Sequence, residues 1–134
     1  MTTEIVRVDW VDERVFLLKD HNDFPIVMTQ PHGVKGADLL PLGLIGCSAW
    51  DLIDILQKQR QQVTGLKVFA DSEREETAPW RFTAIHIRYK VSGHTLDTDK
   101  VKRAVELTEK KYCSIYATLR DAVELSSEVE IINE

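Results

Sequence analysis

The chain has 134 residues, a net charge of −5 and only two cysteines, Cys47 and Cys113. A chain of this length without a glycine-, proline- or serine-rich linker is expected to form one domain, residues 1–134, whose core needs no disulfide or metal. The acidic balance argues against nucleic-acid or anionic-membrane partners, which require a basic stripe. The amino terminus has no signal-peptide pattern, and Asp51 and Asp54 interrupt the longest apolar run. We therefore expect a cytoplasmic protein without a membrane span.

The first forty residues predict a small antiparallel meander. Glu4–Trp10, Val15–Leu18 and Pro25–Thr29 are rich in β-branched, aromatic or other apolar residues, and polar turns separate them. Residues 30–36 contain one proline and two glycines, which is typical of a loop.

A long apolar helix is predicted next, from residue 38 to about residue 62. Leu40, Leu44 and Cys47 recur at helical spacing, and Asp38 is a candidate N-cap. Gly43 and Gly46 are costly in a helix interior, so either another backbone packs against them or the helix breaks before Cys47. We favour a continuous helix.

The second half predicts two strands, two helices and a last strand. A strand at residues 66–71 is followed by a charged loop at residues 72–79 and by the clearest strand, residues 80–92, in which apolar and polar residues alternate. A helix is expected to begin at Asp97 or Thr98, and a shorter helix follows Cys113 up to Leu119. The last strand spans Val123–Ile131. The order βββαββαβ indicates the α+β class.

The two cysteines are either inert buried residues or a functional pair, because cytosolic thiols normally stay reduced. A thiol becomes nucleophilic near a cation or a hydrogen-bond donor, whereas nearby negative charge opposes the thiolate. Asp51 and Asp54 lie at i+4 and i+7 from Cys47, so an activating cation must come from elsewhere in the fold. The candidates are Arg7, Arg14, Arg81, Arg88, Lys110 and Lys111. The two aspartates themselves are expected on a solvated or arginine-paired helix face.

The remaining polar and aromatic residues point to no other chemistry. The four histidines are scattered, and none has zinc-site spacing with a cysteine, so no metal site is expected. No glycine-rich phosphate loop is present. Ser48 and Ser114 lack a neighbouring base. The three tryptophans are expected in the core or at an interface, with Trp50 a candidate for a pocket wall beside Cys47.

Two separated cysteine segments resemble those of the OsmC/Ohr family of thiol peroxidases. Leu39–Arg60, which reads LLPLGLIGCSAWDLIDILQKQR, is similar to the first-cysteine helix of that family, and Glu109–Leu119, EKKYCSIYATL, is similar to its second-cysteine segment. The intervening strand and helix occur in family order, so the resemblance spans essentially the whole chain. It is closest to the less characterised OsmC-like branch.

The resemblance implies an intertwined homodimer and an antioxidant, stress-response peroxidase without metal or organic cofactor. Cys47 would attack a hydroperoxide, from an organic peroxide or hydrogen peroxide, and become a sulfenic acid. Cys113 would then condense with it to a disulfide, which an external dithiol reductant reopens.

One family feature is missing. The peroxidases proper carry a glutamate upstream of the first cysteine, paired with an arginine that polarises the thiolate, but Ala37 stands at that place here. Arg14 is the candidate for the arginine. Asp38 is either a helix N-cap or a substitute partner for that arginine. The alternative to a peroxidase is therefore a non-catalytic dimer of the same fold that binds a small molecule or regulates.

Overall fold

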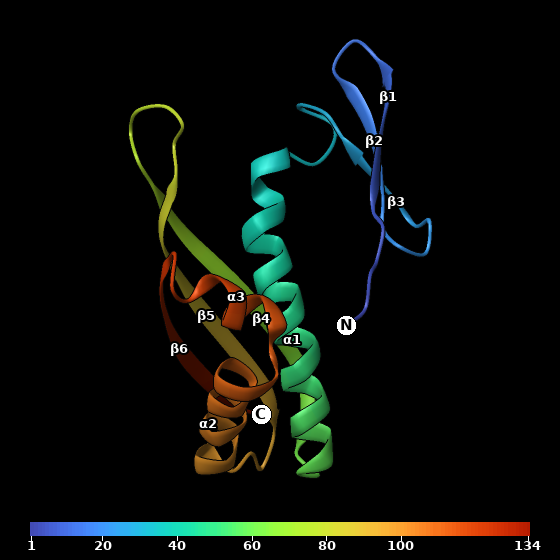
Figure 1. Ribbon diagram of the computed structural model, residues 1–134. Coiled ribbons are helices and arrows are strands. Elements are labelled where there is room, and N and C mark those ends of the chain that lie inside the picture. Colours follow the sequence, from blue (N-terminus) through green and yellow to red (C-terminus); the bar gives the residue numbers. More distant parts are fainter. The chain divides into compact units, whose positions relative to one another are not determined.

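The computed structural model describes residues 1–134 and divides into two compact units, Met1–Leu40 and Pro41–Glu134. The first unit contains the predicted meander. Strands β1 (Arg7–Asp12), β2 (Val15–Lys19) and β3 (Pro25–Met28) pair antiparallel in the order β1-β2-β3 (Figure 1). No residue in this unit is fully buried. A three-stranded sheet without a buried face needs a partner surface to be stable.

The central helix is continuous, as predicted. A short 3-10 turn, η1 (Gly36–Asp38), leads directly into α1 (Leu39–Lys58). The N-cap of this turn is Lys35, so the N-cap interpretation of Asp38 is wrong: the chain becomes helical three residues earlier than expected. Asp38 is exposed.

Only one stripe of α1 is buried. Its buried residues are Leu44, Ser48, Leu52 and Leu56, spaced four residues apart. By length and composition alone, residues 36–58 would suffice to cross a membrane, contrary to the expectation from Asp51 and Asp54. Such a match is weak, since the core helix of a soluble protein meets the same criterion, and the buried stripe of α1 joins the protein core.

A second sheet forms the main layer of the larger unit. Strands β4 (Gln62–Arg74), β5 (Phe82–His94) and β6 (Glu124–Asn133) lie in that order, with β5 antiparallel to β4 and parallel to β6. The predicted strand at residues 66–71 was too short, and the first three residues of the predicted loop at residues 72–79 belong to the strand. The reason is pairing with β5, which continues as far as Arg74 opposite Phe82.

Helices α1, α2 (Thr98–Leu107) and α3 (Ser114–Leu119) cover one face of this sheet, and a π-helical turn, η2 (Thr108–Tyr112), joins the last two (Figure 1). The predicted inward face of β5 is confirmed: its buried side chains are Ile85, Ile87, Tyr89 and Val91. Asp97 is the N-cap of α2, because its carboxylate accepts from the backbone N–H groups of Asp99 and Lys100. The α+β class is confirmed.

Candidate active site

The fold brings the two cysteines together although they are far apart in the sequence. Cys47 lies in the middle of α1, and Cys113 lies between η2 and α3. Their sulfur atoms are within 4.8 Å of each other, and both thiols are free. Cys47 is half-buried, whereas only 2% of Cys113 is exposed. A disulfide bond would require the two sulfur atoms to approach to about 2.05 Å.

Cys113 is held by hydrogen-bond donors. Its Sγ accepts the Ser48 hydroxyl at 3.5 Å and the backbone N–H of Tyr116 at 3.4 Å, as the N-cap of α3. Burial raises the pKa of the Cys113 thiol, and contact with Cys47 adds to the rise, while these two hydrogen bonds oppose it. Cys113 is therefore fixed in position and shielded from solvent.

Cys47 has no cation among its hydrogen-bonding neighbours in residues 41–134. Its Sγ lies 4.0 Å from a carboxylate oxygen of Asp51 and 3.9 Å from the Ser114 hydroxyl. Burial raises the pKa of Asp51, and the nearby charge of Asp54 contributes. Asp54 lies on the expected solvated face and pairs with Lys58 at 3.0 Å, whereas Asp51 is half-buried beside Cys47. The i+4 spacing already placed Asp51 beside Cys47; its partial burial follows from the packing of the helix.

A polar network behind Cys113 was not predicted from the sequence. The Glu109 carboxylate accepts hydrogen bonds from the Tyr89 hydroxyl and the Ser127 hydroxyl, each at 3.0 Å. The Ser48 hydroxyl, which donates to the Cys113 sulfur at 3.5 Å, lies beside the Tyr89 hydroxyl, so polar side chains extend from Glu109 to Cys113. Desolvation raises the pKa of Glu109 above its ordinary value, although both hydroxyl donors oppose the rise.

This network makes a prediction for the pH dependence of stability. Because the pKa of Glu109 is raised in the folded state, folded Glu109 holds its proton more tightly than unfolded Glu109, which titrates near pH ~4.3. The contribution of protonated Glu109 to stability is complete below the pKa of the unfolded state. It is lost as the pH rises through the raised pKa of the folded state. Glu109→Gln should remove this loss, so that the variant gains stability relative to wild type with rising pH. Urea unfolding of both proteins between pH 4 and 8 measures this difference in the free energy of unfolding.

Glu106→Gln is the matched control for removing a carboxylate, since Glu106 is exposed and pairs with Lys110 at 3.1 Å. If the difference in unfolding free energy between Glu109→Gln and wild type does not change with pH, the pKa of Glu109 is not raised in the folded protein, and the account of the buried network is wrong.

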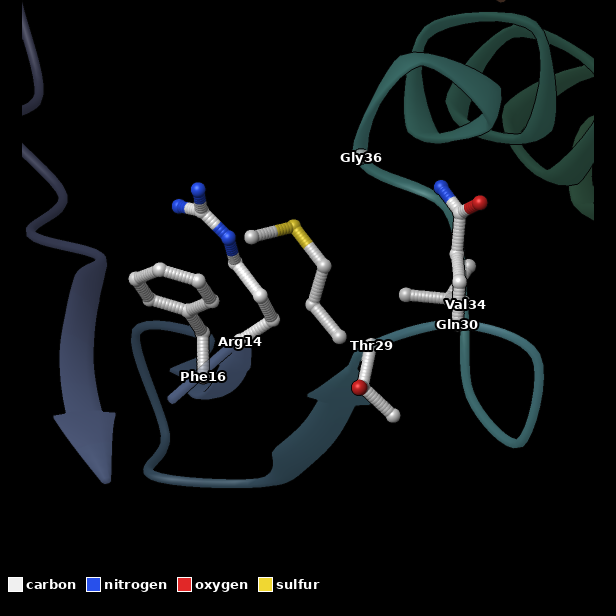
Figure 2. Close-up of a pocket in the computed structure, with 7 residues that line it drawn as sticks. Arg14, Phe16, Thr29, Gln30, Val34 and Gly36 are labelled. Carbon is white, nitrogen blue, oxygen red and sulfur yellow. The ribbon is translucent and has the colours of Figure 1, made fainter. Parts of the chain in front are cut away.

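Arg14 and Asp38, the other two predicted site residues, belong to the N-terminal unit. Arg14 lines a pocket of about 470 Å³ with Phe16, Met28, Gln30 and other residues of that unit. Figure 2 shows Arg14 and Phe16 extending side by side into this pocket. The Asp38 carboxylate is exposed. An arginine in an apolar pocket is well placed to meet an anionic or polar group, but the pocket itself contains no thiol.

The three tryptophans were expected either in the core or at an interface, and the structure shows that they do not lie in the core. Trp10, Trp50 and Trp80 are all exposed, and 79% of Trp50 is accessible. Trp50 lines an open pocket of about 490 Å³ along α1, with Gly46 and Ile53 among its neighbours, but Cys47 does not line this pocket. The face of α1 that carries Trp50 is therefore apolar and uncovered.

Comparison with known proteins identifies the family to which the chain belongs. Residues 29–128 match the family described as OsmC-like protein. The chain belongs to the OsmC-like family. This OsmC-like chain is 38% identical over 129 residues to Protein YhfA of Escherichia coli K12, covering 94% of the chain and 96% of that protein.

Solved structures show the same fold. A hypothetical protein from Aquifex aeolicus superimposes with a TM-score of 0.89 at 28% identity, covering 100% of this chain and 99% of that one. The organic hydroperoxide resistance protein OhrB of Bacillus subtilis superimposes with a TM-score of 0.64 at 16% identity, covering 96% and 98%. At 16% identity, the similarity to OhrB is a similarity of fold alone.

Proposed function

We propose that this OsmC-like protein is a thiol-dependent hydroperoxide reductase. The Cys47 thiolate attacks the O–O bond of an organic hydroperoxide or hydrogen peroxide. Cys47 becomes a sulfenic acid, and an alcohol or water leaves. The Cys113 thiol then displaces the sulfenic hydroxyl as water and forms the disulfide. An external dithiol reduces the disulfide and is itself oxidised. The reaction balances without a metal or organic cofactor.

The observation that carries the proposal is the juxtaposition of two free thiols with different exposure. The half-buried thiol of Cys47 suits the residue that must meet a peroxide. The thiol of Cys113 is buried and held by two donors, which suits the residue that needs to meet only Cys47. Membership in the OsmC-like family and the fold shared with OhrB support the same assignment. A cytosolic setting would keep both thiols reduced between turnovers.

Intact-mass measurement after treatment with one equivalent of cumene hydroperoxide tests the proposal. Wild type should become lighter by the two hydrogen atoms lost on forming a Cys47–Cys113 disulfide, and a dithiol should restore the original mass. Cys47→Ser should show no such change. Persistence of both thiols in wild type would reject the reductase assignment.

A non-catalytic dimer that binds a small molecule or regulates is the second candidate. Two observations favour it: Ala37 stands where the family peroxidases carry a glutamate, and no cation is among the hydrogen-bonding neighbours of Cys47 in residues 41–134. It predicts that the mass experiment leaves both thiols unchanged. The same experiment therefore separates the two functions.

The cation that activates Cys47 is proposed to be Arg14. Arg14→Ala should slow peroxide reduction by roughly 10- to 100-fold, since loss of a cation raises the free energy of the thiolate. Stopped-flow kinetics under pseudo-first-order conditions measures this effect.

Arg7→Ala is the matched control, because Arg7 belongs to the same unit and already pairs with Asp9 at 3.0 Å. Equal rates for Arg14→Ala and Arg7→Ala would remove Arg14 from the proposed mechanism.

A further inference from the structure

A carboxylate completes a cluster of metal-ligating groups around the two cysteines. Cys47 Sγ, Cys113 Sγ and a carboxylate oxygen of Asp51 all lie within 4.8 Å of one another. Cys47 and Asp51 are one helical turn apart on α1, and Cys113 approaches them from the start of α3. The expectation of no metal site considered only histidine–cysteine pairs, and so this carboxylate was overlooked.

The spacing suits a tetrahedral ion. With metal–sulfur bonds of about 2.3 Å and metal–oxygen bonds of about 2.0 Å, ligand atoms around zinc lie roughly 3.5–3.8 Å apart. The Cys47 sulfur and the Asp51 oxygen are 4.0 Å apart, and no pair in the cluster exceeds 4.8 Å. Side-chain shifts of about 1 Å or less would therefore bring all three ligands to bonding distance, with water as a fourth ligand.

The charge of the cluster and the hydrogen bonds to Cys113 also favour a soft or borderline dication. In the ionised state the cluster holds two thiolates and a carboxylate, with Asp54 close enough to affect Asp51, and it holds no cationic side chain. The donors on Cys113, from Ser48 and Tyr116, would fix that ligand and stabilise its thiolate, as outer-shell groups do in metal sites. Asp51 also lines a surface pocket of about 300 Å³, which provides an entry path.

We propose that the reduced protein binds one zinc-like divalent ion per chain through Cys47, Asp51 and Cys113. Thiolate ligands select zinc and similar ions over magnesium or calcium. Binding occupies both thiols, so the metal-bound form does not react with peroxide. A two-electron oxidant such as diamide, which is reduced to the hydrazine as the metal-free protein forms the Cys47–Cys113 disulfide, removes two of the three ligands, so the oxidised protein no longer binds the ion. The site would thus be filled only while the thiols are reduced.

Cobalt is the probe for this site, since tetrahedral cobalt thiolates give charge-transfer absorption in the near ultraviolet. Reduced full-length protein is titrated with Co²⁺ under argon, and Zn²⁺ competition against a chromophoric chelator gives the affinity. We expect one ion per chain and loss of the thiolate band in Cys47→Ser. No peroxide enters the assay, so its outcome does not depend on the reductase assignment.

Asp51 is tested against Asp54 as a matched pair on one helix. Asp51→Asn should weaken zinc binding at least roughly tenfold, as loss of an anionic ligand requires. Asp54→Asn should leave the affinity within about twofold of wild type, because Asp54 pairs with Lys58 and is no ligand. Circular dichroism establishes that both variants are folded.

Several outcomes overturn the site. They are absence of a thiolate band at excess cobalt, equal weakening by Asp51→Asn and Asp54→Asn, retained binding after oxidation with diamide, and a stoichiometry other than one ion per chain.

Discussion

Replacing Cys47 by serine should slow peroxide reduction at least about a thousandfold, because the variant loses the thiol that we propose attacks the O–O bond. Cys113→Ser should behave differently. Its Cys47 should still react once, at a rate close to that of wild type, and then remain as a sulfenic acid that dimedone labels. Steady-state turnover with a dithiol and the first-turnover rate together distinguish the two roles.

The contrast between these variants depends on the different environments of the thiols. Cys47 is the more accessible, whereas Cys113 is buried and accepts two hydrogen bonds. If the first turnover were lost in Cys113→Ser and kept in Cys47→Ser, the roles of the two thiols would be reversed. If both variants kept it, neither thiol would be the nucleophile.

Replacing Trp50 by glutamate should dissociate the homodimer that the resemblance to the OsmC/Ohr family implies. Trp50 lies on the open apolar face of α1, where a Cβ added at Gly46 would meet no atom within 4 Å. The buried stripe of α1 is narrow, and the N-terminal unit contains no fully buried residue. A second copy covering these surfaces would explain both features. The dissociation constant should rise roughly thirtyfold or more, the effect of losing about 2 kcal/mol at a central aromatic contact.

Light scattering coupled to size exclusion at micromolar concentration measures the effect. Lys102→Glu, on the exposed side of α2, introduces a negative charge away from that face and should leave the dimer intact. A wild-type mass of 15.4 kDa, that of one chain, would contradict the dimer directly. Dissociation by both variants would place the interface elsewhere.

Local patterns in the sequence predicted the parts of the fold that local forces determine. Alternation of apolar residues from Ile85 to Val91 identified the buried face of β5. The carboxylate of Asp97 identified the start of α2, because a side-chain acceptor satisfies the first free backbone donors.

Features that depend on distant partners were missed. The extension of β4 to Arg74 arises from pairing with β5, which local composition does not encode. Glu109 was not recognised as a site residue because its partners, Tyr89 and Ser127, lie on two different strands. The position of Asp51 beside Cys113 likewise could not be predicted from the sequence. It depends on the tertiary packing that brings the two cysteines together.

The cluster of Cys47, Asp51 and Cys113 links the two proposals made for this protein. The Asp51 carboxylate lies 4.0 Å from the Cys47 sulfur, and a bound dication would attract both groups. The protein would then hold its thiols either as metal ligands or, in the presence of an activating cation, as a peroxidatic pair. Zinc added in stoichiometric amounts should therefore protect both thiols from oxidation.

The most direct test of the central claim is the second-order rate constant for thiol loss with cumene hydroperoxide, measured by stopped flow at pH 7 with metal-free, reduced protein. The reaction should be at least about a thousandfold faster than that of free cysteine under the same conditions, as expected for an activated nucleophile in a pre-organised site. A rate equal to that of free cysteine, with Cys47→Ser no slower than wild type, would contradict the peroxidase account.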